Sequence, residues 1–331
     1  MGVARLRLAG LLAAGLMTGP LAGSGAAQAQ DPQALRAACI TALKDTLDKP
    51  AKPETLDLCE LAVAVNPPDA ELKSWLAAAL LRSGQEDRAL EAFLTAAQAG
   101  YLDAQKTLGL MYLRQGRSGA DVAQAAAWLR AVAEAGDSEV QNILGTLYLK
   151  GIGVAADPGE AAHWFRRATV SGNTDAQTNL AYLHLNGIGL PRDPAAAISL
   201  YRAAAKQGSP IAQTALGGIY IQGDGVERDV DEATRWFRLS AEQGWPPGQN
   251  NLGMLYLDGL GVERDLALAE QWIRRAAVAG HPHAQANLGQ IYEKGLGIPQ
   301  DTAQALAWYR RAAAQGHPGA AESVRRLGGT P

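Results

Sequence analysis

The sequence predicts an all-α fold, an α/α superhelical solenoid of helix-turn-helix repeats with a period of 36 residues. The first observation behind this prediction is a column of glycines at constant spacing. The second is a set of other residue types that keep the same register, and the third is a pair of helical apolar stripes inside each period. The glycine column consists of Gly100, Gly136, Gly172, Gly208, Gly244, Gly280 and Gly316.

Four further columns share this spacing without a slip. They hold glutamine, aspartate, alanine and arginine, in that order along each repeat. The columns start at Gln105, Asp121, Ala125 and Arg130 and end at Gln285, Asp301, Ala305 and Arg310. Self-similarity of this length is typical of solenoids, in which each repeat buries its apolar face against the next one.

The last full repeat shows why each period should form two helices. Small and apolar residues first recur on one helix face, at Ala284, Leu288, Gly289 and Tyr292. Gly295 and Gly297 then break this helix, and Asp301 can cap the start of a second one. The second apolar stripe comprises Ala305, Trp308, Tyr309, Ala312 and Ala313. Gly316 suits the end of that helix, because glycine adopts the left-handed conformation readily.

A Gly-x-Gly pair recurs between the two helices of a repeat, at Gly151, Gly187, Gly223, Gly259 and Gly295, each with its partner two residues on. A dinucleotide-binding loop would follow a strand, whereas a helix precedes these glycines. Five nucleotide sites in a row are also implausible. The pairs are therefore interpreted as turns between packed helices.

The first 29 residues have the three parts of a secretory signal peptide. Arg5 and Arg7 precede an apolar run from Leu8 to about Leu21, and a small-residue segment ends at Ala29, where we expect cleavage. We therefore expect export across the inner membrane, into the periplasm. Removing two arginines takes Lys+Arg from 30 to 28 against 33 Asp+Glu, so the net charge becomes −5. We expect no nucleic-acid partner and no membrane span.

Cys39 and Cys59 are expected to form a disulfide, because an exported chain favours oxidised cysteines. A redox pair is the alternative, but the spacing differs from the Cys-x-x-Cys of redox enzymes. The predicted organisation is then a helical hairpin at residues 30–69, a degenerate unit at 70–100, six repeats, and a capping helix with a tail at 317–331. The six repeats are 101–136, 137–172, 173–208, 209–244, 245–280 and 281–316.

The segment ANLGQIYEKGLGIPQDTAQALAWYRRAAAQG, Ala286–Gly316, resembles the Sel-one-like repeat, a branch of the tetratricopeptide superfamily. The resemblance covers the six repeats, and residues 70–100 are similar to an ordinary tetratricopeptide unit. It implies an α/α superhelix that binds other proteins and has no catalytic activity. It also implies that the first helix of each repeat lines a concave face.

The positions expected on that face are counted from the glycine of the Leu-Gly pair in each first helix. They are the third residue before this glycine and the first and fifth residues after it. They are the expected contacts of a partner: Asn142, Thr146, Lys150, Thr178, Tyr182, Asn186, Thr214, Gln222, Asn250, Met254, Asp258, Gln290 and Lys294. These columns vary between repeats while the core columns do not. Variation of this kind fits a specific binding surface, and it also fits an unconstrained solvent face.

Several single features carry alternatives. The third repeat has Ala181, His184 and Leu200 where other repeats have Gly, Tyr and Trp, and it places Tyr182 beside amides. This is either drift or a ligand-facing aromatic. The tryptophan column is interpreted as core, and the arginine column as pairing with a neighbouring repeat. His281, His283 and His317 could hold a metal in principle, but surface residues are the better interpretation, so no metal and no cofactor are expected.

The leading functional hypothesis is an exported, non-catalytic scaffold or adaptor that binds a protein or peptide in an envelope-associated process. The alternative is a binding module for peptidoglycan or envelope polysaccharide. A hydrolase is the third and weakest hypothesis. Nucleophile and base motifs such as Gly-x-Ser-x-Gly, Ser-x-x-Lys and His-Glu-x-x-His are missing from the sequence.

Overall fold

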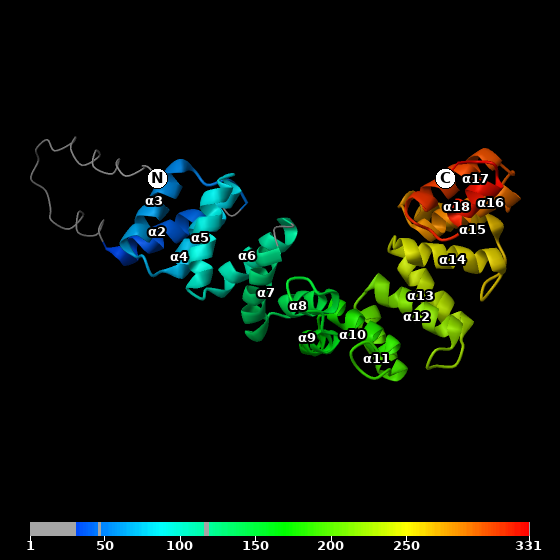
Figure 1. Ribbon diagram of the computed structural model, residues 1–331, viewed down its shortest axis with the longest axis horizontal. Helices are drawn as coiled ribbons and strands as arrows, with labels where there is room; N and C mark the ends of the chain where they lie inside the picture. Colours follow the sequence, from blue (N-terminus) through cyan, green and yellow to red (C-terminus); the bar gives the residue numbers. More distant parts are fainter. Residues whose placement is uncertain (1–30, 46–47, 116–118, 331) are drawn as a thin grey trace, which may run out of the picture. The chain divides into compact units, whose positions relative to one another are not determined.

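The structure is a computed structural model that describes residues 31–45, 48–115 and 119–330. Within these ranges it contains helices α2 to α18 and no strand (Figure 1), which confirms the all-α prediction. The predicted signal peptide lies outside the described residues. No helix in the described ranges combines the length and the apolarity that a membrane span requires. The chain divides after Leu108 into two compact units, which are described in turn.

The first unit contains two helical hairpins and the beginning of a further helix. Its elements are α2 (Pro32–Lys44), α3 (Pro53–Val65), α4 (Ala70–Arg82), α5 (Glu86–Gln98) and the start of α6 (Leu102–Gln115). Leu43, Leu56, Leu72 and Leu80 are buried in a shared core of α2, α3 and α4. Arg36 on α2 pairs with Asp69, at 2.6 Å between Nε and Oδ2, and with Glu71 at the start of α4.

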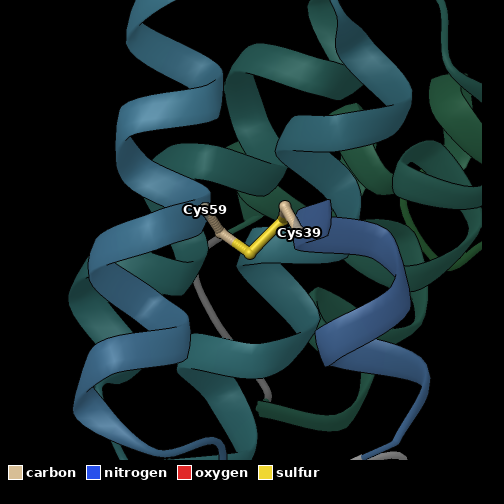
Figure 2. The surroundings of a disulfide bond; sticks show 2 residues. All are labelled: Cys39 and Cys59. Carbon is tan, nitrogen blue, oxygen red and sulfur yellow. A yellow bond between two sulfur atoms is a disulfide. The ribbon is translucent and has the colours of Figure 1, made fainter. Parts of the chain in front are cut away.

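A disulfide between Cys39 and Cys59 joins α2 to α3 (Figure 2), as the sequence predicts. Both residues are fully buried, and their Cα atoms lie 5.0 Å apart. The bridge closes a loop over a sequence separation of 20 residues. On the chain-entropy account, a loop of this size stabilises the folded state by about 3 kcal/mol.

The second unit is a row of helix pairs in which each helix packs against the next one along the chain. After the end of α6, its helices are α7 (Gly119–Glu134), α8 (Ser138–Lys150), α9 (Pro158–Val170), α10 (Thr174–Asn186), α11 (Pro194–Lys206), α12 (Pro210–Gln222), α13 (Val230–Glu242), α14 (Pro246–Asp258), α15 (Leu266–Val278), α16 (Pro282–Lys294), α17 (Thr302–Ala314) and α18 (Ala320–Arg326). The even-numbered helices up to α16 are the first helices of the repeats, and the odd-numbered helices are the second.

The two positions of each Gly-x-Gly pair require glycine for different structural reasons. The first one ends the preceding helix in the left-handed conformation, with φ of +64° at Gly295. The second one, with φ of +73° at Gly297, lies against the previous repeat. A Cβ atom there would be 2.7 Å from Cβ of Leu266 and 2.9 Å from its carbonyl carbon. The glycine turn therefore lets successive repeats approach closely, and no phosphate is needed to explain it.

Aspartates of the predicted column cap the second helices. Oδ1 of Asp301 accepts from the backbone N–H of Gln304 at 2.9 Å, and Asp157, Asp193, Asp229 and Asp265 make equivalent bonds. The backbone N–H of the same aspartate donates back to the first helix, at 2.9 Å from Asp301 to the carbonyl of Tyr292. Each connecting loop is thereby held at both of its ends.

The glutamine and arginine columns join neighbouring helices. The buried amide of Gln141 donates from Nε2 to the carbonyl oxygen of Ala133 at 2.9 Å, and the same bond recurs at Gln105, Gln213, Gln249 and Gln285. Arg274 donates to the hydroxyl of Tyr292 in the next repeat at 2.8 Å. Arg130, Arg202 and Arg238 contact the corresponding tyrosine hydroxyls. The expected pairing of the arginine column with a neighbouring repeat is therefore observed.

The tryptophan column is largely core, as expected. Trp128, Trp164 and Trp308 are buried, while Trp236 and Trp272 are half-buried. Small residues on the facing helix make room for the second-helix aromatics. At Gly217, an added Cβ would lie 2.5 Å from the ring of Phe237. The final helix α18 coincides with the predicted cap, and Val324 packs in a small core with Ala305 and Tyr309.

Candidate partner-binding surface

The exposed sides of α8, α10, α12, α14 and α16 form the surface on which sequence reasoning placed a partner; we call it the first-helix surface. On α10 it consists of Asn179, Tyr182 and Asn186, which stand at i, i+3 and i+7 and so share one face. Equivalent positions on the other four helices define the rest of it. Because the repeats keep one register, the same columns recur on each helix of the row.

Most of the expected contact residues have exposed or half-buried side chains. They are Asn142, Thr146, Lys150, Tyr182, Asn186, Thr214, Gln222, Met254, Asp258, Gln290 and Lys294. Tyr182 stands out, because half of its surface (50%) is exposed although tyrosine is a large aromatic residue. The charged members have mixed signs, with two lysines and one aspartate.

Thr178 and Asn250 are corrections to the predicted surface. Only 8% of Thr178 and 6% of Asn250 is exposed, so a partner could not reach them without displacing other side chains. Their column turns into the seam between neighbouring helices. The hydroxyl of Thr178 donates to the carbonyl oxygen of Thr174, and Thr214 in the same column shares a 2.8 Å hydrogen bond with Ser240 on α13. The sequence rule had placed this column too close to the exposed face.

Amide pairs link first helices of consecutive repeats. Nδ2 of Asn179 on α10 donates to Oδ1 of Asn142 on α8 at 2.9 Å. Nδ2 of Asn287 on α16 donates to Oδ1 of Asn250 on α14 at the same distance. Both pairs span 37 residues, one repeat plus one position. An asparagine side chain carries both donors and an acceptor. The Oδ1 atoms of Asn179 and Asn287 can therefore still accept a hydrogen bond from a partner.

Asn179 and Asn287 belong to a column that sequence reasoning left out of the surface. It lies two residues before the glycine position and also contains Asn251. The signal was present in the sequence, since this position stands three residues before the Tyr182 column and seven before the Asn186 column. Helical periodicity then places all three on one face. The rule used for the prediction chose the neighbouring, more buried column instead.

The third repeat differs from the others in its core. His184 stands where other repeats have tyrosine, so Arg166 has no hydroxyl opposite it, and Nδ1 of His184 is buried with no described partner. Tyr201 on α11 is buried, and burial raises its pKa to about 12. Leu200, which stands in the tryptophan column, is half-buried against the same core.

At its last helix the first-helix surface adjoins a polar hollow of about 420 Å³ between α16, α17 and α18. Glu293 lies in this hollow, accepts from Tyr309 at 2.8 Å between oxygens, and receives both terminal nitrogens of Arg326. The pKa of Glu293 is lowered, first because Arg326 donates to it. Arg326 thereby links the final helix α18 to the last repeat.

His281, His283 and His317 cluster near the same end. Nδ1 of His283 and Nε2 of His317 form a hydrogen bond at 3.1 Å, in which the ring tautomers decide which nitrogen donates. Burial lowers the pKa of His281 and of His317, and the neighbouring His283 lowers both further. The described residues contain no group of three or more side chains arranged to hold a metal ion. A hydrogen-bonded histidine pair accounts for the cluster.

The first-helix surface can therefore bind through hydrogen bonds and one aromatic ring. Its amides and hydroxyls can donate to and accept from a polypeptide backbone or a sugar, and Tyr182 offers an apolar face with a polar tip. No column on it carries charges of a single sign. A ligand recognised by this surface would be uncharged or weakly charged along most of its length.

Comparison with known proteins gives the family. The model of the Sel1 repeat matches residues 102–137, 138–172, 174–209, 210–245, 246–281 and 282–317. Among curated proteins, none matches this chain. The solved structures that match over most of the chain include the following two. The first is c5321, a protective antigen present in uropathogenic Escherichia coli strains that displays an SLR fold, with 31% identity and a TM-score of 0.67. The second is a Sel1 repeat protein from Oxalobacter formigenes, with 26% identity and a TM-score of 0.74.

The two matches differ in extent. The alignment to the E. coli antigen covers 80% of this chain but only 57% of the antigen, so this chain spans little more than half of that protein. The alignment to the Oxalobacter protein covers 91% of this chain and 88% of the other. The six family matches together cover more than half of the chain, in the register of the six predicted repeats. The chain is therefore a member of the Sel1 repeat family.

Proposed function

We propose that the chain is a non-catalytic scaffold that binds an extended segment of another protein on its first-helix surface. The observation that carries the proposal is the exposed Tyr182 beside the amide pair of Asn142 and Asn179. Sel1 repeat proteins are generally interaction scaffolds, which supports the class of function but not the identity of a partner.

The chemistry of the surface favours an extended backbone. An extended chain rises by about 3.3 Å per residue and exposes alternating N–H and C=O groups. Amide side chains can satisfy both kinds of group, and they do so without a desolvated charge. The tyrosine ring would then pack against an apolar side chain of the partner, with its hydroxyl near solvent.

We further propose that the protein works outside the cytoplasm, in an envelope-associated process in the periplasm. The signal-peptide pattern of residues 1–29 supports this, and so does the disulfide in the first unit. This assignment is tested by fusing the chain to a reporter enzyme that becomes active only after export. A reporter that stays inactive with residues 1–29 present contradicts it.

Site-specific photocrosslinking in cells tests the binding surface. A photoreactive residue at position 182 should capture a single partner protein, and one at position 170 should not. Val170 at the end of α9 is the matched control, because it is 86% exposed and lies on a second helix.

The captured partner should then bind the purified chain, and Tyr182→Ser should weaken that binding at least tenfold while Val170→Ser leaves it unchanged. Equal weakening by both changes would contradict a specific role of the first-helix surface. Tyr182 beside amides is also suited to stacking on a sugar, so a glycan is the second candidate. Retention on peptidoglycan that depends on Tyr182, with no protein captured at position 182, would favour that candidate.

A further inference from the structure

The first unit contains a hollow of about 500 Å³, within the range of small-ligand sites. One wall is a single face of α4, formed by residues at helical spacing that include Ser74, Trp75 and Arg82. Phe93 of α5 and the segment from Tyr101 to Thr107 line it from the other elements. This hollow lies wholly in the first unit and contains no residue of the first-helix surface.

Arg82 is the notable group in this hollow. Its Nε and Nη2 atoms are buried, and no described acceptor lies within hydrogen-bonding distance of either. Several arginines of the repeats differ from Arg82 because they have an acceptor. Arg274, for example, donates to the hydroxyl of Tyr292. Buried donors without acceptors cost free energy, and an arginine in that state calls for an anion or an ordered solvent partner.

The two acidic side chains of the hollow already have partners. Glu71 accepts from Arg36 of α2. Burial and then the negative charge of Asp103 raise the pKa of Tyr101 to about 12, so the phenol of Tyr101 stays protonated beside the Asp103 carboxylate. Neither carboxylate reaches Arg82 as a hydrogen-bond acceptor. The positive charge of Arg82 is therefore the charge in the hollow that lacks a counter-ion.

The remaining walls are apolar or neutral. Trp75 and Leu81 are half-buried at the rim, Phe93 is buried, and Ser74 adds a hydroxyl. Trp75 and Arg82 are seven residues apart on α4, which corresponds to about 10 Å along the helix axis. Three residues of an extended chain span roughly that distance. The spacing thus suits a ligand with an anionic end and an apolar body.

We propose that this hollow, which we call the Arg82 pocket, binds the C-terminal carboxylate of a partner polypeptide whose last residues are apolar. The guanidinium of Arg82 accepts the planar carboxylate in a two-bond arrangement, and Trp75 and Phe93 contact the apolar side chains. A single negative charge fits better than a phosphate dianion, because Glu71 and Asp103 also line the hollow. This proposal does not depend on the first-helix surface, which lies in the other unit.

Nuclear magnetic resonance of the full chain tests the proposal. The indole N–H signal of Trp75, assigned with a Trp75→Phe variant, is followed during titration with the peptide N-acetyl-Ala-Ala-Leu bearing a free carboxyl group. We expect a saturable shift of this signal. The C-terminal amide of the same peptide should bind at least tenfold more weakly, because it lacks the anion that Arg82 requires.

Variants and simple anions complete the design. Arg82→Gln should weaken binding of the peptide acid at least tenfold, whereas Arg88→Gln on α5, whose arginine pairs with Glu60, should not. The comparison of acid with amide needs no variant, so it stands even where Arg82→Gln fails to fold. Equal binding of acid and amide overturns the proposal. Inorganic phosphate or acetate binding as tightly as the peptide acid overturns the assignment to a polypeptide C-terminus.

Discussion

The first unit holds α2 against α3 with a covalent bond between Cys39 and Cys59, whereas the second unit holds its helices with non-covalent contacts that recur in register. In the second unit the second glycine of each turn lies against the previous repeat. A buried glutamine such as Gln141 also donates a hydrogen bond to a carbonyl oxygen of the previous helix. The α2–α3 hairpin has neither device. Its connection carries no Gly-x-Gly pair and no counterpart of Gln141.

This difference shows two physical solutions to the same problem. A repeat can draw stability from its neighbours on both sides, so each interface contributes a similar share. The α2–α3 hairpin differs in sequence from the repeats and cannot form their interface, and a disulfide lowers the entropy of its unfolded chain instead. The consequence is that the two units should respond differently to reduction, to glycine substitution and to pH.

The largest effect is expected at the glycine that touches the previous repeat. Gly297→Ala should destabilise the second unit by about 2–5 kcal/mol, the sum of left-handed strain and overpacking against Leu266. Gly172→Ala is the matched control, because its φ of +76° is similar and nothing lies within 4 Å of an added Cβ. It should cost only about 1–2 kcal/mol. Equal shifts of the urea midpoint would mean that the close approach to Leu266 is unimportant.

Loss of the disulfide should come next in size and should be confined to the first unit. Replacing both Cys39 and Cys59 by serine should lower the stability of that unit by about 3 kcal/mol, through the greater entropy of its unfolded chain. Hydrogen exchange resolved by peptide mass spectrometry measures this, with faster exchange in residues 31–108 and unchanged exchange in the repeats. Faster exchange throughout residues 119–330 would contradict the separation into two units.

A smaller effect tests the arginine–tyrosine contacts of the second unit. Tyr292→Phe removes the hydroxyl that Arg274 donates to and should cost about 1 kcal/mol. His184→Tyr in the third repeat should have the opposite sign, since it offers Arg166 the hydroxyl that the other repeats have. Thermal unfolding of the two variants measures both changes. A destabilised His184→Tyr variant would show that the third repeat has repacked around histidine.

The smallest expected effect is a pH dependence near the last repeat. The folded pKa values of His281 and His317 lie below their ordinary 6.5, first because of burial. The unfolded chain therefore binds protons more readily as the pH falls below about 6.5, and stability is lost toward pH 5. Urea unfolding at pH 7.5 and 5.5 should show this loss, reduced in a His281→Asn, His317→Asn variant. A loss that both proteins share in full would assign it to other groups.

Much of the architecture could be predicted from the sequence because it depends on short-range rules. Asp301 caps α17 as expected, since a cap is decided within four residues of chain. A capping helix was expected within residues 317–331, and α18 is found at Ala320–Arg326. The pairing of the arginine column with a neighbouring repeat was also foreseen. The register alone determined which side chains recur at each interface.

The candidate site was less predictable. Thr178 and Asn250 were expected on the surface and are buried, because the width of the exposed stripe depends on how closely neighbouring first helices approach. The Asn179 column was left out although helical periodicity places it on the exposed face, because the prediction chose the neighbouring column. The Arg82 pocket had no sequence signal, since it forms where α4, α5 and the start of α6 converge and where one guanidinium lacks an acceptor.

The sequence by itself determined the helices, their caps, their order and the repeat register, all of which follow from local propensity and a period of 36 residues. The tertiary structure decided which faces remain exposed, why the second glycine of each turn must be glycine, and which charged side chains find partners. Those outcomes depend on distances between helices. Such distances result from the packing of many side chains at once, which no single stretch of sequence contains.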